Sequence, residues 1–380
     1  MAINVFVPKF HTEEILAEIR ECLDKGWTGL GFKTVEFETK WKEYSGIKNA
    51  HFLNSNTAGL HLAVHILKKT EGWKDYDEII TTPLTFVSTN HAILYERLKP
   101  VFADVDEYLC LDPKSVKQCI TKRTRAVMYV GMGGNTGRYE DILDLCKKNN
   151  LKLILDAAHM AGTKWKGKHI GPESDVAVFS YQAVKNLPTA DAGMICFKDE
   201  ELDKLARQLS WLGISKDTYA RFNNKEGSYK WYYNVPNIGF KYHGNSIVAS
   251  IAIIQLKYLE SDNKQRNAIA QKYLKLINNN PGIKTIPIAK DCYSSRHLFQ
   301  ILVENRDEII EELYRNSIFP GVHYINNTEY AMYDYAKGKC KNAEYYGNRL
   351  ISLPMHLNLN DEDINSVINV LNNAILKLHG

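Results

Sequence analysis

The chain has 380 residues, of which 44% are hydrophobic and 24% are charged. These ordinary globular values exclude a disordered chain, and the length suggests two to three domains with a large core. The 48 Lys and Arg side chains outnumber the 44 Asp and Glu side chains by only four. This small and evenly spread excess excludes nucleic acid and membrane surfaces as expected partners.

The seven cysteines are an odd number and include no CxxC pair. This argues against a disulfide framework or a structural zinc site and indicates a reducing compartment. The N-terminal sequence MAINVFVPKFHTEE lacks the apolar stretch of a signal peptide, and the longest nearly apolar run, residues 246–256, is too short to span a bilayer. We therefore expect a cytoplasmic protein.

The first predicted element is an amphipathic helix over residues 12–25, followed by Gly26. Short apolar runs then alternate with helical segments. Because these runs lack strict polar alternation, they indicate strands buried on both faces of a mostly parallel α/β sheet. The predicted strands cover residues 50–53, 78–81, 100–103, 125–130, 152–155, 175–179 and 192–197. The helices between them cover residues 58–68, 90–97, 113–120 and 139–149.

The second half of the chain has a different pattern. Residues 214–242 are polar, aromatic and glycine-containing, which predicts a long functional loop or a subunit contact. After them we expect a long helix over 245–276, strands over 282–287 and 297–303, and helices over 306–316 and 361–378. The sequence thus predicts a large α/β domain over residues 1–244 and a smaller α+β domain over residues 245–380.

Ligands of open α/β sheets bind beyond the carboxyl ends of the strands, so the residues after each predicted strand are candidates. The segment NSNTAGL after residues 50–53 opens a helix and suits a phosphate group, although plain capping by Asn56 or Thr57 is the simpler alternative. Asp156 ends a buried strand. Such a carboxylate either caps the next turn or needs a cationic partner, for which a protonated pyridine nitrogen is suited.

Ser180 and Lys185 follow the predicted strand over 175–179, and residues 176–184 carry no charge. A lysine in uncharged surroundings loses its proton readily and becomes a nucleophile toward carbonyl groups, whereas the default alternative is a solvated surface lysine. A phosphate-binding turn, a strand-end aspartate, a serine and a lysine, in this order, together describe a site for pyridoxal phosphate (PLP).

The chain resembles the DegT/StrS family of PLP-dependent nucleotide-sugar aminotransferases. The matching stretches run in family order from about residue 26 to 371, and include NSNTAGLHLAV, LDAAHMAGTKWKGKHIG, DVAVFSYQAVKNLPTADAGM and LISLPMHLNLNDEDI. The resemblance implies the PLP-dependent transferase fold of the aspartate aminotransferase type (fold type I). This fold has a large, mostly parallel-sheet domain and a smaller C-terminal α+β domain.

The resemblance also implies a role for each matching residue. Lys185 would form the Schiff base with PLP and carry protons, and Asp156 would pair with the pyridinium nitrogen. The other residues expected to hold the cofactor are Thr57, Ala58 and Ser180 at the phosphate, Phe86 and His159 at the ring, and Lys241 from the partner subunit of a homodimer. The residues expected to face the substrate are Trp27, Thr28, His323, Tyr324 and His356; for each histidine, a packed core residue is the alternative.

The sequence departs from the family pattern in the loop over 239–243, where Lys241 and His243 replace the usual Asn and Arg. A lysine can still reach a phosphate as a point charge. Asn56 and Gly59 also differ from the commonest family residues, but both are small enough to keep the helix start.

His61 and His65 lie four apart on a predicted helix, which is a metal-ligand spacing. The sequence has no HExxH motif and no acidic third ligand near them, so we expect no metal.

The implied reaction transfers an amino group from L-glutamate to a keto-deoxy sugar on a nucleoside diphosphate, for surface glycans such as the O-antigen of lipopolysaccharide or for glycosylated metabolites. A cyclitol ketone as acceptor and a non-catalytic PLP-binding sensory protein stay open as alternatives. A sugar dehydratase is disfavoured, because relatives of that type carry histidine in place of the lysine at position 185.

Overall fold

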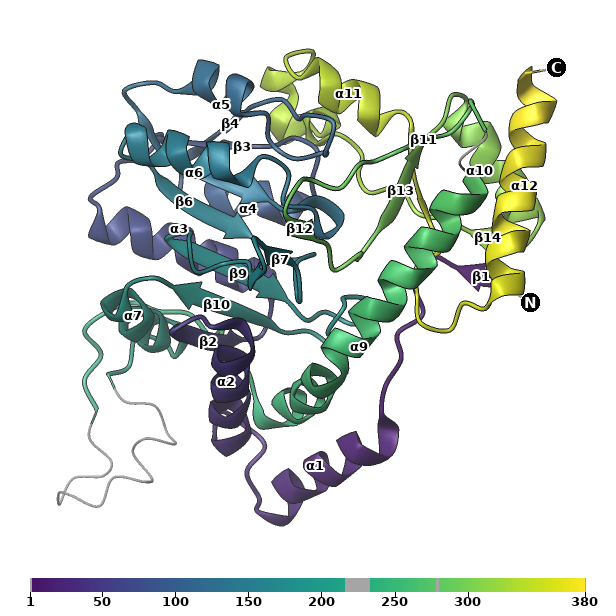
Figure 1. Cartoon of the computed structure of the whole chain (residues 1–380). Coiled ribbons are helices and arrows are strands. Elements are labelled where there is room, and N and C mark those ends of the chain that lie inside the picture. Colours follow the sequence, from purple (N-terminus) through teal and green to yellow (C-terminus); the bar gives the residue numbers. More distant parts are fainter. Residues whose placement is uncertain (1, 216–232, 278–279, 380) are drawn as a thin grey trace.

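The computed structural model describes residues 2–215, 233–277 and 280–379 (Figure 1). Its central sheet contains β2 (Asn49–Leu53), β3 (Glu78–Thr81), β4 (Lys99–Phe102), β5 (Thr124–Val130), β6 (Lys152–Asp156), β9 (Val176–Ser180) and β10 (Gly193–Phe197). The strand order is β2-β10-β9-β6-β5-β3-β4. β10 is antiparallel to both of its neighbours, and the other neighbouring strands are parallel.

Both faces of this sheet are apolar, because alternate residues of a strand point to opposite faces. In β5, Val127 and Tyr129 belong to one core, whereas Ala126 and Met128 belong to the other. The first core also contains residues of α2 (Phe32–Ser45), α5 (Pro113–Cys119), α6 (Tyr139–Lys148) and the start of α9 (Ser246–Ile277). The second contains residues of α3 (Asn56–Thr70), α4 (Val87–Tyr95) and α7 (Glu200–Ser210). The predicted α/β class with its mostly parallel sheet is confirmed.

The C-terminal residues form a smaller core around a second, antiparallel sheet. Its strands, in the order β11-β13-β15, are β11 (Lys284–Thr285), β13 (Phe299–Leu302) and β15 (Leu350–Leu353). Side chains of α10 (Arg306–Arg315) and α12 (Asp361–His379) complete this core. The N-terminal strand β1 (Ile3–Asn4) pairs with β14 (Ile318–Phe319), so both ends of the chain lie on this side of the molecule (Figure 1).

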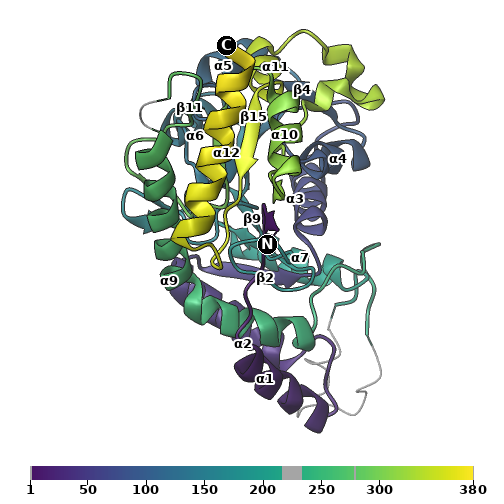
Figure 2. The ribbon, with the colours of Figure 1, turned by 90° about the vertical axis from the view of Figure 1, so that its right-hand side faces the viewer.

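Helix α9 joins the two parts of the molecule (Figure 2). Its first half packs against α1 (Thr12–Asp24) and α2 and contributes to the core of the large sheet. Its last turns, from Ile269 onward, belong to the C-terminal core. The division of the chain at residue 244 stays a prediction, and α9 takes part in both cores.

The remaining elements are short and connect the larger ones. They are β7 (Lys164–Trp165), β8 (Lys168–His169), β12 (Cys292–Tyr293), α11 (Lys341–Gly347) and the 3₁₀ helices Met132–Gly134, Asn327–Glu329 and Ala331–Ala336. Of the predicted functional loop over 214–242, residues 216–232 lie outside the described residues. In the described part of the chain, no helix is long and apolar enough to cross a membrane.

Two sequence predictions differ from the fold for identifiable reasons. Helix α2 was not predicted, because it contains β-branched and aromatic residues and buries polar ones such as Lys33 and Glu38, which obscures the apolar stripe. The strand predicted over 282–287 is reduced to Lys284–Thr285. Pro287 has no backbone N–H to donate to a neighbouring strand, which favours a short pairing.

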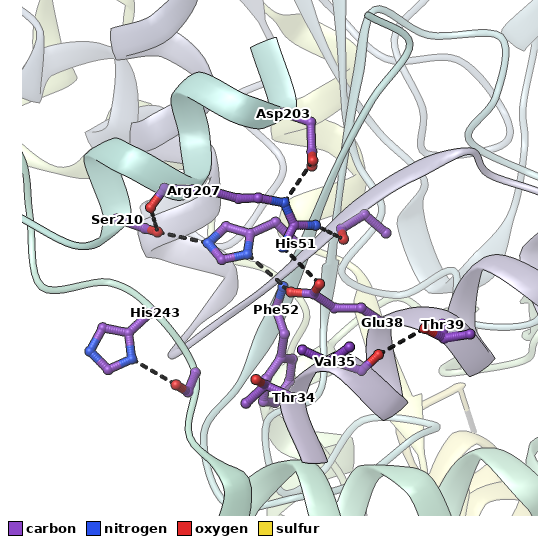
Figure 3. Close-up of polar contacts among 12 residues, drawn as sticks. Thr34, Val35, Glu38, Thr39, His51, Phe52, Asp203, Arg207, Ser210 and His243 are labelled. Atoms are coloured by element: carbon purple, nitrogen blue, oxygen red, sulfur yellow. Dashed lines mark hydrogen bonds and ion pairs between the residues drawn. The ribbon is translucent and has the colours of Figure 1, made fainter. Parts of the chain in front are cut away.

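A buried polar network ties α2 and α7 to β2 at the edge of the sheet (Figure 3). A carboxylate oxygen of Glu38 lies 3.0 Å from His51 Nδ1, and the other accepts a hydrogen bond of 2.8 Å from Arg207 Nη1. The second ring nitrogen of His51, Nε2, lies 2.7 Å from Ser210 Oγ. Burial acts to raise the pKa of Glu38, but the contacts with His51 and Arg207 lower it below its ordinary value, so the carboxylate stays ionised.

The same network supports the segment that follows β2. The carbonyl oxygen of Ser210 accepts a hydrogen bond from Tyr242 N (3.0 Å), and the carbonyl oxygen of Tyr242 accepts one from Asn54 N (2.7 Å). Asn54 directly precedes the turn into α3. The Glu38 network therefore fixes, through α7, the backbone from which α3 begins.

We predict that Glu38→Ala lowers the free energy of unfolding by about 1–3 kcal/mol, because the change leaves buried His51 Nδ1 and the backbone N–H of Phe52 without the carboxylate oxygen that they share. Urea unfolding of the cofactor-loaded protein, followed by circular dichroism, measures this loss. Glu43→Ala on the same helix is the control: Glu43 is exposed, and we expect a change within about 0.5 kcal/mol. Equal unfolding midpoints for the two variants would contradict this role of Glu38.

Candidate active site

A cavity of about 460 Å³ lies at the edge of the large sheet where the carboxyl ends of β2, β3, β5, β6 and β9 meet. This is the edge at which the strand-end rule places a ligand. Residues of the C-terminal part close its other side. The predicted site residues among those that line the cavity are Thr57, Phe86, Asp156, His159, Ser180, Lys185, His323 and Tyr324.

Asp156 is the last residue of β6 and is only 4% exposed. One carboxylate oxygen accepts a hydrogen bond from Thr89 Oγ1 (2.7 Å), and the other accepts one from Ala158 N (3.1 Å). Burial raises the pKa of Asp156, and these two hydrogen bonds oppose the rise only in part. A cation placed in the cavity beside Asp156 would lower the pKa again, so the carboxylate suits a protonated pyridine nitrogen.

Lys185 lies on the loop between β9 and β10, and its backbone N–H donates to the carbonyl oxygen of Gln182 (2.8 Å). Its side chain is partly exposed because it faces the cavity. Among the described residues, no hydrogen-bond or ion-pair partner meets its Nζ. Burial by the surrounding protein lowers the pKa of Lys185 to about 8, while the charge of Asp156 acts in the opposite direction. More of this amine is therefore neutral and nucleophilic at physiological pH than in an exposed lysine.

The turn from β2 into α3 forms the end of the cavity that suits a phosphate group. Ser55 is the N-cap of α3, and its Oγ accepts a hydrogen bond from Ala58 N (3.1 Å). Asn56 Nδ2 donates to the carbonyl oxygen of Val178 (3.0 Å), which ties the turn to β9. Thr57 lines the cavity, whereas Ala58 does not and uses its N–H for the cap. The other N–H groups of this first turn are suited to an anion.

Two glycines let the turn approach the sheet closely. A Cβ atom at Gly193 of β10 would lie 2.6 Å from the backbone of Ser55. A Cβ atom at Gly59 would lie 2.4 Å from Val178 Cγ1, so glycine at this position, which departs from the family pattern, lets α3 pack directly on β9.

His159 and Tyr324 form an aromatic wall of the cavity. His159 Nδ1 accepts a hydrogen bond from Gly133 N (3.2 Å), so Nε2 carries the proton and donates to Tyr324 Oη (3.1 Å). Burial lowers the pKa of His159 well below its ordinary range, which keeps the ring neutral. Phe86, at the N-cap of α4, is 57% exposed, and its ring lies 5.9 Å from that of Tyr324.

These features together fit PLP. The helix start receives the phosphate, Asp156 faces a cationic ring nitrogen, the wall around His159 is suited to a flat aromatic ring, and Lys185 offers an unpaired amine to an aldehyde. His323 also borders the cavity, where burial and the charge of Lys185 lower its pKa to about 4.

Several predicted site residues lie outside this cavity. Trp27 Nε1 donates to the carbonyl oxygen of Leu30 (2.8 Å), and the carbonyl oxygen of Thr28 accepts from Ser246 N (3.0 Å); neither residue lines the cavity. Lys241 Nζ lies 3.5 Å from the centre of the Trp211 ring, also outside it. His356 borders a separate cavity of about 10 Å³ on another side of Lys185.

His243 also lies away from this cavity. Its Nδ1 is 2.7 Å from the carbonyl oxygen of Gly244, and the ring is directed away from the Glu38 network (Figure 3). Its role stays a prediction.

The fold supplies an acidic neighbour to His61 and His65 that the sequence spacing does not show. Glu96, just beyond α4, has one oxygen 2.9 Å from His61 Nε2 and 2.9 Å from His65 Nδ1. The prediction that no acidic third ligand lies near this pair is therefore wrong. Within the described ranges, no group of three or more His, Cys, Asp or Glu side chains is arranged to hold a metal ion. The histidines instead hold a half-buried carboxylate.

Sequence reasoning missed other residues that line the cavity, including Thr89, Gln182 and His297. Thr89 follows the predicted strand over 78–81, and Gln182 follows that over 175–179, so a wider application of the strand-end rule would have found both. His297 precedes a strand and comes from the C-terminal part, so no local signal marks it.

Comparisons with known proteins show the family of the chain. The model of the DegT/DnrJ/EryC1/StrS aminotransferase family matches residues 9–372. The spore coat polysaccharide biosynthesis protein SpsC of Bacillus subtilis is 35% identical over 97% of this chain and 96% of that protein. The dTDP-4-dehydro-2,3,6-trideoxy-D-glucose 4-aminotransferase of Saccharopolyspora spinosa is 32% identical over 98% of this chain and 97% of that protein.

A solved structure extends the similarity to the fold. The PLP form of Spr1654 from Streptococcus pneumoniae has a TM-score of 0.91 with this chain, at 26% identity, and the match covers 100% of both chains. The predicted fold type I architecture and the predicted PLP cofactor are thereby confirmed. The chain belongs to the DegT/DnrJ/EryC1/StrS aminotransferase family.

Proposed function

We propose that this aminotransferase transfers the amino group of L-glutamate to a keto sugar carried on a nucleoside diphosphate. The observation that carries the proposal is that buried Asp156 and Lys185, whose amine has no partner among the described residues, line one cavity at the strand ends. The similarity to the Saccharopolyspora spinosa enzyme, named for a dTDP-linked keto sugar, supports a nucleotide-linked acceptor. The similarity to SpsC supports a role in surface glycan synthesis.

The residues of this chain divide the chemistry between them. When bound, PLP supplies an electron sink for a carbanion next to nitrogen. Asp156 stabilises the positive ring nitrogen on which that sink depends. Lys185 would hold the cofactor through its amine, and its free amine would take and return a proton at the reacting carbon. His159 and Tyr324 would hold the ring plane, and Thr57 and Ser180, which line the same cavity, would bind the phosphate.

We further propose that the site is completed by a second copy of the chain. Trp27, Thr28 and Lys241 do not line the cavity of their own chain, although the family resemblance assigns them to the site. Large exposed apolar side chains, including Phe86 at the cavity and Ile238 near Lys241, are available to a partner's surface. A cytoplasmic location is also part of the proposal, because all seven cysteines are described and are free thiols.

The direct test of the function is incubation of the holoenzyme with L-glutamate and a panel of nucleotide-linked keto sugars, with the products read by mass spectrometry. We expect one or more amino sugars from the wild type. Lys185→Ala should reduce the turnover rate by at least a factor of about 100, because the proton carrier is lost.

The control is Lys168→Ala, which removes an exposed lysine of β8 and should leave the rate unchanged. Turnover of a keto cyclitol but of no sugar nucleotide would replace the proposed acceptor. If the wild type binds PLP but its cofactor absorbance does not change on addition of glutamate, a non-catalytic role would be supported.

The shared site predicts complementation between two inactive variants. Lys185→Ala removes the reacting amine, and Lys241→Ala removes a cation expected at the partner subunit's cofactor. A mixed dimer then contains one site with Lys185 from one subunit and Lys241 from the other, so mixing the variants under exchanging conditions should restore activity toward half of the wild-type value per mixed dimer. Activity no higher than the sum of the separate variants would show that Lys241 does not act across subunits.

A further inference from the structure

His297 is a residue of the cavity to which the mechanism above gives no role. It lies just before β13, is 1% exposed, and lines the same cavity as Lys185. Its ring stacks on Phe6, with centroids 5.3 Å apart and planes within 8°, and its centroid lies 4.4 Å from that of His159. The His297 imidazole therefore packs against two aromatic rings, which restrict its orientation.

A buried amide next to Lys185 determines which nitrogen of His297 carries the proton. Asn186 Nδ2 donates to the carbonyl oxygen of Ser295 (2.7 Å) and to Asn263 Oδ1 (2.7 Å). The orientation of Asn263 is itself fixed, because its Nδ2 donates to the carbonyl oxygen of Ala161 (3.0 Å). Carbonyl oxygens only accept, so the nitrogen of Asn186 must face Ser295 and its Oδ1 must face His297.

Asn186 Oδ1 lies 3.0 Å from His297 Nδ1. Since this oxygen can only accept, Nδ1 carries the proton, and Nε2 holds a lone pair while the ring is neutral. Burial, together with the positive charge of Lys185, lowers the pKa of His297 well below its ordinary range. The ring is therefore neutral at physiological pH.

Nε2 of His297 has no hydrogen-bond partner in the described part of the chain. The atom is not completely enclosed by the surrounding protein. The small exposed area of this side chain thus includes Nε2, which faces the cavity. The protein presents the substrate with a neutral hydrogen-bond acceptor whose direction is fixed by Phe6, His159 and Asn186.

The two proposed substrates differ in what they can offer to such an acceptor. The carboxylates of glutamate only accept hydrogen bonds, and its one donor, the amino group, is occupied at the reacting centre. A sugar carries hydroxyl groups that donate. We infer that His297 is a specificity residue that accepts a hydrogen bond from a hydroxyl group of the keto sugar; this inference rests on the proposed function.

The test compares the two half-reactions of the holoenzyme. His297→Phe keeps an aromatic ring in contact with Phe6 and His159 but removes the acceptor. We expect the half-reaction with glutamate, followed by the cofactor absorbance, to stay within about twofold of wild type. The kcat/KM for the keto sugar should fall roughly ten- to a hundredfold, as expected when a buried polar partner is lost. His297→Gln, which can still accept, should recover part of this loss.

Analogues of the sugar that lack one hydroxyl group at a time sharpen the comparison. In the wild type, the kcat/KM for one analogue should be lower than that for the parent sugar by about the factor that His297→Phe causes. The His297→Phe variant should have the same kcat/KM for this analogue and for the parent sugar. His91→Phe, a histidine-to-phenylalanine change outside the cavity, is the matched control and should change neither half-reaction. Equal losses in both half-reactions of His297→Phe would instead mean that His297 only positions Lys185, and would overturn the inference.

A readout without turnover separates this inference from the proposed function. In the holoenzyme labelled with ¹⁵N-histidine, the ¹⁵N spectrum should show His297 protonated at Nδ1 and unprotonated at Nε2. An unreactive sugar nucleotide, with a hydroxyl in place of the keto group, should shift the Nε2 signal. Protonation at Nε2, or no shift on saturation, would refute the role of His297 even if the enzyme turns over keto sugars. Failure to accept any keto sugar would refute the proposed function while leaving the protonation pattern of His297 intact.

Discussion

The placement of one amine and one carboxylate in a cavity at the end of an apolar sheet is the constraint on which the rest of the site depends. Asp156 ends β6 and Lys185 follows β9, and both strands are enclosed on both faces. The surrounding protein therefore disfavours the charged form of each side chain. Without a ligand, this arrangement lowers the pKa of the lysine and raises that of the aspartate. A cofactor that brings a cationic ring nitrogen to Asp156 would stabilise the carboxylate, and its aldehyde would react with the neutral amine of Lys185.

Contacts from several elements hold the backbone around these two groups. The turn into α3 is held by Asn56 on β9, by the close approach at Gly193, and indirectly by the Glu38 network through α7. The C-terminal part contributes the opposite wall through His297, His323 and Tyr324. Because α9 takes part in both cores, the two walls belong to one continuous structure.

The parts of the site that the sequence predicts are those that depend on local order. Asp156 and Lys185 follow strands whose apolar runs are unmistakable, and the helix start after β2 has a recognisable composition. Helix α2 and the pairing of Glu96 with His61 and His65 depend on contacts between distant segments, which no local pattern records. His297 reaches the cavity only because the C-terminal part folds back over the sheet. The roles proposed for Trp27, Thr28 and Lys241 depend on a second subunit, so they follow from no local pattern of the chain.

The pH dependence of cofactor attachment tests the central claim most directly. PLP is added to protein freed of cofactor, the adduct is reduced with borohydride at each pH, and the modified lysine is located by peptide mass spectrometry. Only the neutral amine reacts, and burial lowers the pKa of Lys185 to about 8 from the ordinary value of about 10.4. The rate of attachment should therefore rise with pH through a midpoint near 8, with the label on Lys185. A midpoint near 10.4, or a label on another lysine, would contradict the account.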